Sequence, residues 1–295
     1  MRRLTVGVPA YNNAATLRAN VEGLLAQDFG DFELLISDDV STDATREVGE
    51  ALARQDGRVR YVRQPRNLRY DNFLYLLREA RTELFMWAAA DDHHDPRFVA
   101  ACVDALDVTP QAVLAVSRVG FTEEGRSAGT SDGTFALTGS PAHNVRRFLL
   151  APGDNSRMYG VMRREPAQRC FPQPACHAYD WAFSAATLRF GWHLEIPQVL
   201  MSRDRTPWRN YAAAAEVDAR TPGERWFPLL AMTRWLLRDA RMPRETDILR
   251  ALLALNLDKH FEIAELRMPR YARVVAPLAR LWKQRLRRRL RGADA

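Results

Sequence analysis

The sequence predicts an α/β fold, in which a mostly parallel β-sheet is flanked by helices and followed by a helical C-terminal region. Over the first 110 residues, apolar strand-like segments alternate with segments of helical spacing. This alternation indicates a parallel sheet with helices on both faces. From Gly223 onward the apolar spacing is helical, and no strand pattern follows. We therefore expect a sheet domain over residues 1–210 and a helical, basic region over residues 211–295.

Each predicted element rests on the spacing of its apolar residues. The strands are short apolar runs at 4–9, 32–37, 58–63, 82–90, 112–121, 157–164, 192–197 and 198–205. The helices have apolar residues three or four positions apart, at 14–27, 43–54, 70–80 and 179–191. Residues 123–134 are rich in Gly and Ser, which predicts a loop.

Composition and charge limit the classes of function. Hydrophobic residues make up 47% of the 295 residues and charged residues 27%, as in ordinary globular proteins. We find no signal peptide and no apolar stretch of the length that predicts a transmembrane helix. The three cysteines, Cys102, Cys170 and Cys176, have no metal-ligand spacing, which favours a reduced, cytoplasmic compartment.

The net charge of +7 is concentrated near the C-terminus. Residues 201–295 hold 21 Lys and Arg against 11 Asp and Glu, whereas acidic residues are in slight excess over residues 1–200. This distribution favours a basic appendage over a nucleic-acid groove, so we expect no nucleic-acid partner.

Polar clusters follow three of the predicted strands. The sequence AYNN follows the first strand, DDVSTD the second and DDHHD the fourth. Ligands of open α/β sheets bind at the carboxyl ends of the strands, where loops converge. The sequence therefore predicts a ligand site at this edge of the sheet.

The adjacent carboxylates of Asp91 and Asp92 predict a bound cation. At the end of a buried strand they raise each other's pKa unless a cation lies beside them. Hard divalent ions such as Mg²⁺ or Mn²⁺ take oxygen ligands, often one or two carboxylates plus substrate phosphates. Favourable placement at the start of the next helix explains Asp95, which precedes Pro96, but does not explain the earlier pair.

Four linked segments resemble the family 2 glycosyltransferases, which have the GT-A nucleotide-sugar-binding fold. These segments are VGVPAYNNAATLRANVEGLLAQ, FELLISDDVSTDAT, RNLRYDNFLYLLREART and LFMWAAADDHHDP. They occur in that family's order and with similar spacing. The resemblance covers residues 3–105 and continues more weakly to about residue 205. It implies a Rossmann-like GT-A domain that binds a nucleotide-sugar donor.

The resemblance implies a nucleotide site at the strand ends. Its implied members are Pro9, Ala10, Tyr11, Asp38, Asp39, Arg69 and Asp91. In the family, the first loop packs an aromatic residue beside the base, and one of the two aspartates of the second strand accepts a hydrogen bond from the base. Asp91 would face the ribose. Structural explanations compete, because Tyr11 could cover the sheet edge, the two aspartates could cap the next helix, and Arg69 could be a solvated loop residue.

Asp92 is implied as the ligand of the metal, Mn²⁺ or Mg²⁺, that bridges the diphosphate. The chain departs from the family at His93, where a third aspartate is common. This departure leaves open which carboxylate holds the metal. We expect His93 and His94 to face solvent or an acceptor.

Sugar transfer with inversion requires a general base on the acceptor hydroxyl. The segment HAYDWAFS, residues 177–184, resembles the family's base motif and implies Asp180 in this role. The chain has Tyr179 where the family often has glutamate. Alternatively, Asp180 is only the N-cap of the helix that follows.

Two later segments resemble the acceptor side and the diphosphate loop of the family. In residues 154–165, Gly160 would let the backbone approach a ligand, or it is an ordinary strand glycine at a bulge. In residues 201–211, the implied contacts to the diphosphate are the basic side chains of Arg203, Arg205 and Arg209.

The C-terminal tail, residues 278–295, has seven Lys and Arg between residues 280 and 291 and no acidic residue there. Its apolar residues recur every four positions, at Leu278, Trp282, Leu286 and Leu290. This pattern predicts a helix that binds an anionic membrane surface. Alternatively, the apolar stripe packs on the rest of the chain.

We predict an inverting, metal-dependent glycosyltransferase that acts by direct displacement on a glycan or lipid-linked glycan acceptor. We expect it in the cytoplasm, peripheral on the inner face of the membrane. One alternative is a nucleotidyltransferase with a related sheet, although the loop PAYNNAAT lacks the Gly- and Lys/Arg-rich sequence usual there. The other alternative is a catalytically inactive nucleotide-sugar-binding module.

Overall fold

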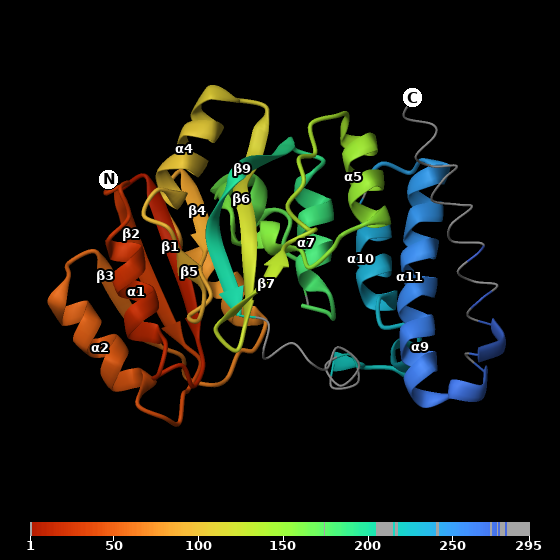
Figure 1. The fold of residues 1–295 in the computed structure, drawn as a ribbon, viewed down its shortest axis with the longest axis horizontal. Helices are drawn as coiled ribbons and strands as arrows, with labels where there is room; N and C mark the ends of the chain where they lie inside the picture. Colours follow the sequence, from red (N-terminus) through yellow and green to blue (C-terminus); the bar gives the residue numbers. More distant parts are fainter. Residues whose placement is uncertain are drawn as a thin grey trace. The chain divides into compact units, whose positions relative to one another are not determined.

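The computed structural model forms two compact units, each built from separated stretches of the chain (Figure 1). The sheet unit comprises residues 1–138, 153–171 and 190–207, and the helical unit comprises residues 139–152, 172–189 and 208–295. The structure describes residues 2–173, 175–204, 215, 218–239, 242–271, 273–275, 277 and 281. The predicted domain boundary at residue 210 falls outside these residues and stays a prediction.

The sheet unit contains a mixed sheet with the strand order β3-β2-β1-β4-β8-β6-β9-β5, and β7 adds to β6. Its first four strands are parallel, as predicted: β1 (Leu4–Ala10), β2 (Phe32–Asp38), β3 (Val59–Arg63) and β4 (Leu84–Trp87). They lie side by side in Figure 1, so the loops that follow them share one edge of the sheet. This arrangement confirms the α/β fold class.

The second half of the sheet is mostly antiparallel, which the sequence did not indicate. The long strands β6 (Ala112–Glu123) and β9 (Trp192–Asp204) are parallel to each other. Three short strands pair antiparallel to their neighbours: β5 (His93–His94) with β9, β7 (Arg126–Thr130) with β6, and β8 (Val161–Arg163) with both β4 and β6. Because β5 pairs with β9, the segment after β4 is fixed against β9.

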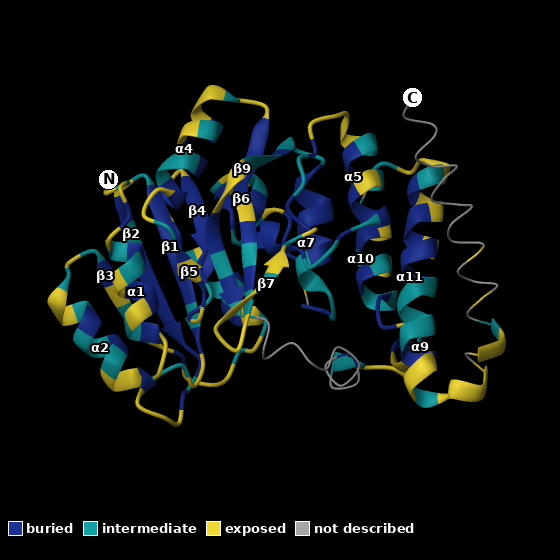
Figure 2. Cartoon of the chain, viewed as in Figure 1, coloured by how far each residue is buried: buried dark blue, intermediate teal, exposed yellow. Residues whose placement is uncertain are grey.

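Helices cover both faces of the parallel strands because alternate side chains point to opposite faces. On one face Leu4, Val6 and Val8 join a buried core that also contains residues of α1 (Leu17–Leu25) and α4 (Phe98–Val108). In Figure 2, β1, β2 and β4 are almost uniformly buried, whereas β3 at the edge of the sheet is mostly intermediate or exposed. Helix α2 (Thr45–Gln55) packs on α1 and on β3.

On the opposite face, α3 (Asp71–Glu79) packs directly on β1. A side chain at Gly7 would meet Leu76 Cβ at 3.1 Å, so this position needs a glycine for close approach of the helix. The neighbouring core is aromatic, with Trp87 in edge contact with Phe85 at 4.8 Å between ring centroids and tilted toward Phe171 at 6.1 Å. The apolar run before Asp91 is therefore a buried central strand.

Four predicted elements beyond residue 120 differ in the structure. The predicted loop at 123–134 contains β7, because Glu124 and Gly125 both have positive φ and form a two-residue turn of a hairpin. The predicted strands at 192–197 and 198–205 are one strand, β9, with register shifts opposite Ser117 and Arg118. The sequence breaks there at Pro197, which cannot donate to the ladder.

The predicted strand at 157–164 is only partly a strand. It begins as a 3-10 helix, η1 (Ser156–Tyr159), continues as β8 and enters the short helix α6 (Arg164–Gln168). The side chain of Asp154 accepts a hydrogen bond from the backbone N–H of Ser156 at 2.8 Å, which starts the 3-10 turn. A side-chain acceptor two residues upstream thus overrides the β-like pattern.

The helical unit confirms the predicted helical C-terminal region and adds two earlier segments to it. Its helices are α5 (Pro141–Leu150), α7 (Tyr179–Thr187), α9 (Pro222–Trp226), α10 (Leu230–Arg238) and α11 (Thr246–Arg267). Helix α5 packs on α7 and α11, and α7 packs on α10. Ser140 and Thr221 cap α5 and α9 with their side chains. In the described part of the chain, no helix combines the length and apolar character of a membrane span.

Candidate active site

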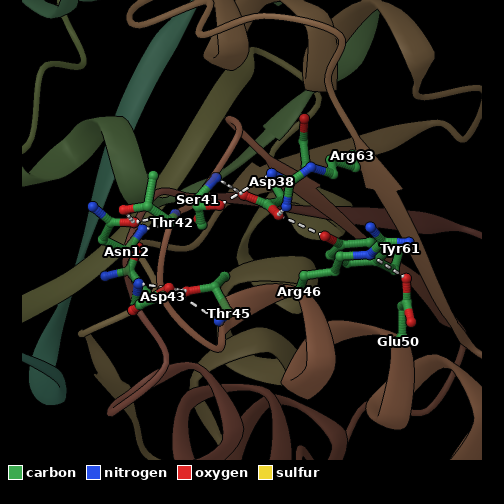
Figure 3. A network of polar contacts seen from close by, with 12 residues as sticks. Asn12, Asp38, Ser41, Thr42, Asp43, Thr45, Arg46, Glu50, Tyr61 and Arg63 are labelled. Atoms are coloured by element: carbon green, nitrogen blue, oxygen red, sulfur yellow. Dashed lines mark hydrogen bonds and ion pairs between the residues drawn. The ribbon is translucent and has the colours of Figure 1, made fainter.

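The loops after β1 and β2 are joined by side chains that bind backbone groups (Figure 3). The side-chain oxygen of Asn12 accepts a hydrogen bond from the backbone N–H of Thr42 at 2.8 Å, and Ser41 Oγ accepts from the backbone N–H of Asn12 at 2.9 Å. Thr45 Oγ1 accepts from the backbone N–H of Asn13 at 2.8 Å. The polar residues of AYNN and DDVSTD therefore build a cross-linked platform beside the end of β1.

Asp38, the last residue of β2, is fully buried and used by the fold. Its Oδ2 accepts hydrogen bonds from Tyr61 Oη at 2.6 Å and Arg63 Nη1 at 3.2 Å, and its Oδ1 accepts from the backbone N–H of Ser41 at 2.8 Å (Figure 3). Burial and the nearby carboxylate raise the pKa of Tyr61 well above its usual range. Asp38 is thus a structural acceptor that joins β2, β3 and the loop between β2 and α2.

Asp39 instead holds the loop that carries Arg69. Its Oδ1 and Oδ2 accept hydrogen bonds from the backbone N–H groups of Leu68 and Arg69 at 2.5 and 2.8 Å. Arg69 has a left-handed backbone, with φ of 54°, and its exposed guanidinium lies over the Tyr70 ring. Each Asp39 oxygen accepts one of these hydrogen bonds, and a carboxylate oxygen has two lone pairs. Asp39, which accepts two hydrogen bonds, therefore retains more acceptor capacity than Asp38, which accepts three.

The remaining implied nucleotide residues lie at the end of β1. Pro9 and Ala10 are opposite Ser37 and Asp38 in the parallel ladder, and the carbonyl of Ala10 accepts a hydrogen bond from the backbone N–H of Asp39 at 2.8 Å. Tyr11 is 51% exposed, so it does not cover the sheet edge as the structural explanation requires. An exposed aromatic ring just after the end of β1 is suited to stacking on a planar ligand.

The turn that carries Asp91 and Asp92 is fixed from two sides. The side-chain amide of Asn20, on α1, donates hydrogen bonds to the backbone carbonyls of Ala89 and Asp92 at 2.9 and 2.7 Å. The next two residues form β5, in register with Ser202 and Met201 of β9. The turn is therefore positioned by α1, β4 and β9 together.

This register brings Arg203 to Asp92, a contact that the sequence did not indicate. Arg203 Nε donates to Asp92 Oδ1 at 3.2 Å, and both side chains are buried. The guanidinium also donates to Ser156 Oγ at 3.3 Å and lies over the Tyr159 ring, 4.2 Å from its centroid. Arg203 is thus a buried cation at the predicted site, held by residues of η1.

The surroundings of Asp92 are suited to binding a divalent cation. It is 5% exposed, and its Oδ2 is buried without a hydrogen-bond partner, whereas Asp91 is exposed. Burial raises the pKa of Asp92 to about 6, with a further contribution from Asp91 and an opposing one from Arg203. A buried anionic oxygen without a partner is costly, and a hard divalent ion satisfies it. The residues therefore fit the predicted Mg²⁺ or Mn²⁺.

The two histidines have different surroundings. His93 is exposed, while His94 is buried against Phe98 and its Nε2 has no hydrogen-bond partner. Burial, together with His93 and Arg203, lowers the pKa of His94 to about 3. Within the described residues, no group of three or more His, Cys, Asp or Glu side chains is arranged to hold a metal ion. In sites of this type one or two carboxylates suffice, because substrate phosphates supply further oxygens.

Gly160 follows η1 and packs against β6. A side chain there would meet the carbonyl oxygen of Ala115 at 2.4 Å and Val116 Cβ at 3.0 Å. The close approach to β6 accounts for the glycine on structural grounds. Its implied place beside an acceptor stays a prediction.

Asp180 lies in the first turn of α7, in the helical unit. The N-cap of this helix is Ala178, which has a positive φ and no side-chain acceptor, so Asp180 is not the N-cap. A carboxylate in the first turn still interacts favourably with the helix dipole. The role of Asp180 as a base stays a prediction.

Some predicted residues lie outside the described part of the chain. They are Arg205, Arg209 and the tail at 278–295, apart from Leu281. Other residues at the site were missed by sequence reasoning, namely Asn20, Ser156 and Tyr159. Asn20 left one signal, since it is a polar residue on the otherwise apolar buried face of α1.

Comparison with known proteins agrees with the fold and with the resemblance seen in the sequence. The family described as glycosyl transferase family 2 matches residues 5–171, more than half of the chain. A Campylobacter jejuni protein named GalNAc(5)-diNAcBac-PP-undecaprenol beta-1,3-glucosyltransferase is 38% identical over 61 residues. The glycosyltransferase GlyG of Streptococcus pneumoniae is 39% identical over 61 residues. Each alignment spans 21% of this chain and about a fifth of the length of that relative.

Two solved structures share the fold at low sequence identity. TarS residues 1–349 of S. aureus, in complex with UDP-GlcNAc, has a TM-score of 0.69 at 17% identity, covering 90% of this chain and 74% of that one. The mannosyltransferase PcManGT of Pyrobaculum calidifontis, in complex with GDP-Man and Mn²⁺, has a TM-score of 0.51 at 19% identity, covering 97% and 84%. The match over residues 5–171 confirms the resemblance seen in the sequence, and the chain belongs to glycosyl transferase family 2.

Proposed function

We propose that the chain is an inverting, metal-dependent glycosyltransferase that moves a sugar from a nucleotide-diphosphate donor to a hydroxyl group of a glycan or lipid-linked glycan. Family membership and structural likeness to proteins solved with UDP-GlcNAc and with GDP-Man and Mn²⁺ support a nucleotide-sugar donor. The single observation that carries the proposal is Asp92, a buried carboxylate with one oxygen on Arg203 and the other without a partner.

On the donor side, the base would stack on exposed Tyr11 and donate its ring N–H to Asp39. Asp39 is favoured over Asp38 because Asp38 already accepts three hydrogen bonds within the fold. Asp91, exposed at the turn, would accept from the ribose. These roles make donor recognition depend on the rigid loops after β1, β2 and β4.

In the transfer step, the oxygen of the acceptor hydroxyl bonds to the anomeric carbon while the bond from that carbon to the diphosphate breaks. The hydroxyl proton passes to the carboxylate of Asp180 as general base, and the electron pair leaves with the nucleoside diphosphate. A divalent ion on Asp92 would supply charge neutralisation to this leaving group. Arg203, a permanent cation on the same carboxylate, would add a second positive charge there.

The acceptor and the location of the enzyme follow from two weaker supports. One curated relative carries PP-undecaprenol in its name, which favours a lipid-linked acceptor. The basic tail at 278–295 favours attachment to an anionic membrane on its cytoplasmic face. We expect deletion of residues 278–295 to release the enzyme from anionic liposomes in a co-sedimentation assay, with the melting temperature unchanged. A lower melting temperature with unaltered liposome binding would indicate that the tail packs on the protein instead.

The test of the proposed activity uses the variant Asp180→Asn. Release of nucleoside diphosphate from UDP- and GDP-sugars is measured with Mn²⁺ and a glycan acceptor. A general base acts only on the acceptor in the transition state, so kcat should fall by about 10²–10⁴-fold while donor affinity is unchanged. Full transfer by the variant at saturating donor and acceptor would refute the base assignment. Absence of any Mn²⁺-dependent turnover in the unmodified protein would instead favour an inactive nucleotide-sugar-binding module.

A further inference from the structure

The helical unit contains a cavity of about 210 Å³ that none of the roles above uses. Its described lining residues come from the segment before α7, from residues 215, 218–220 and 224, from Pro228 and from α10. Pockets that bind whole drug-sized molecules typically measure about 300–1,000 Å³. The cavity is therefore sized for one chemical group of a larger molecule.

Positive charge dominates this cavity. Among the lining residues that the structure describes, three are arginines, Arg220, Arg234 and Arg238, and two are acidic, Asp218 and Glu224. Both carboxylates are already engaged. Asp218 Oδ2 lies 2.9 Å from His177 Nδ1 with both side chains largely buried, and Glu224 accepts a hydrogen bond from the backbone N–H of Arg220 at 2.8 Å. Both carboxylates therefore have partners within the wall, and the three guanidinium groups outnumber them by one.

The charges of Arg234 and Arg238 are the least balanced by acidic neighbours. They lie one turn apart on α10, and both are exposed. Like charges at this spacing repel each other. Neither forms an ion pair or hydrogen bond with another residue in the described ranges, and Trp235 lines the cavity between them in sequence. One guanidinium nitrogen of Arg220 donates a hydrogen bond to the backbone carbonyl of Ala175 at 2.7 Å, which orients the guanidinium group.

The cavity adjoins the start of the helix that carries Asp180. Cys176 and His177 line it, and α7 begins two residues later. Burial raises the pKa of Cys176 to about 12, Arg220 opposes this shift, and the charge of Asp180 adds to it. The Cys176 thiol therefore lies within electrostatic range of both Arg220 and the proposed base.

We propose that this cavity binds a phosphate group of the acceptor, held by Arg220, Arg234 and Arg238. Guanidinium forks match phosphate oxygens in bidentate geometry, and three of them offset the charge of a mono- or diester. Binding there would anchor the acceptor close to the start of α7 and so to Asp180. The acceptor assignment rests on the proposed function, whereas the anion site itself stands on the cavity alone. A lipid-linked diphosphate and a phosphodiester of a polymer both supply this chemistry.

The test titrates the full-length protein with inorganic phosphate, without nucleotide and with EDTA, at constant ionic strength. Binding is read by calorimetry and by tryptophan fluorescence, with Trp235→Phe identifying the signal from the cavity. The double variant Arg234→Gln/Arg238→Gln should bind phosphate at least about tenfold more weakly. The matched control is Arg225→Gln, which removes an exposed arginine of α9 outside the cavity lining and should change affinity by less than about twofold. Circular dichroism and melting temperature check that each variant is folded.

Three outcomes would overturn the proposal: no phosphate binding by the unmodified protein, unchanged affinity in the double variant, or an equal loss in the Arg225→Gln control. Titrations with inorganic diphosphate and with a glycerol phosphodiester distinguish a lipid-linked diphosphate from a polymer phosphodiester. The compound that resembles the natural acceptor should bind more tightly. Mn²⁺-dependent hydrolysis of UDP- and GDP-sugars by the unmodified protein is measured in parallel. Hydrolysis without phosphate binding would contradict the cavity proposal alone. Phosphate binding without any Mn²⁺-dependent turnover of the UDP- and GDP-sugars, either alone or with a glycan acceptor, would support the anion site and contradict the proposed function.

Discussion

Two pairs of adjacent aspartates end two strands that flank β1, and the fold uses them in opposite ways. At the end of β2, Asp38 and Asp39 are buried, and every carboxylate oxygen accepts a hydrogen bond from the protein. At the end of β4, Asp92 is buried with one oxygen on Arg203 and one without a partner, and Asp91 is exposed. The same dipeptide therefore builds a rigid frame at one strand and leaves one buried carboxylate oxygen without a protein partner at the other.

The comparison teaches that partners, more than the motif, distinguish structural from functional acids. Burial alone does not separate them, since Asp38, Asp39 and Asp92 are all buried. The unpartnered oxygen does, because an unsatisfied buried charge costs stability and is kept only where a ligand completes it. We therefore expect mutations at the two strand ends to affect different properties.

The largest expected effect is on stability, from Asp38→Ala. The change leaves Tyr61 Oη, Arg63 and the backbone N–H of Ser41 without their shared acceptor. We expect the free energy of unfolding to fall by about 3 kcal/mol, measured by urea denaturation. The exposed Asp91→Ala is the comparison and should stay within about 0.5 kcal/mol of the unmodified protein. Equal effects of the two variants would break the proposed distinction.

A second prediction concerns the pH dependence of stability at Asp92. Its folded-state pKa of about 6 lies above the usual value of 3.8, so between these values the folded chain binds more protons than the unfolded chain. The stabilising contribution is present below about pH 4 and is lost as pH rises through about 6. Between about pH 4 and pH 6, the free energy of unfolding of the unmodified protein should fall by about 3 kcal/mol more than that of Asp92→Asn. Urea unfolding at a series of pH values, with and without Mn²⁺, measures this difference. Parallel pH profiles for the unmodified protein and Asp92→Asn would contradict the raised pKa of Asp92.

The smallest expected effect is that of Asp39→Ala on donor binding. Removing its carboxylate frees the amides of Leu68 and Arg69, whose hydrogen exchange should accelerate. Binding of the nucleoside diphosphate should weaken by about tenfold even in EDTA, because the residue acts on the base. The control is Asn67→Ala, which removes a neutral acceptor from the same Arg69 amide at 3.0 Å. Loss of only the metal-dependent part of binding in Asp39→Ala would reassign its role.

The sequence predicted the first half of the fold well because β1 to β4 are apolar, central and parallel. Their periodicity is strong, and the acids at their ends stand out against buried neighbours. The second half was harder, since the β7 hairpin turns on a Glu-Gly pair and η1 depends on the side chain of Asp154. Such turn chemistry is local and carries little periodic signal.

The candidate site was predictable as a set of strand-end acids, but the pairing among its residues was not. Arg203 reaches Asp92 through the register of β5 on β9, a contact between residues 111 positions apart. No local pattern encodes such a register. The cavity with Arg234 and Arg238 was missed for the same reason, because it joins segments that lie far apart in the chain.

The most direct test of the account measures how Mn²⁺ affects binding of UDP and GDP to the unmodified protein and to Asp92→Asn by calorimetry. If the unpartnered Asp92 oxygen is the metal ligand, Mn²⁺ should tighten nucleoside diphosphate binding at least about tenfold in the unmodified protein, worth about 1.4 kcal/mol. In Asp92→Asn, Mn²⁺ should leave affinity unchanged, while binding in EDTA matches that of the unmodified protein. Equal tightening by Mn²⁺ in both proteins would contradict the central claim that Asp92 holds the metal.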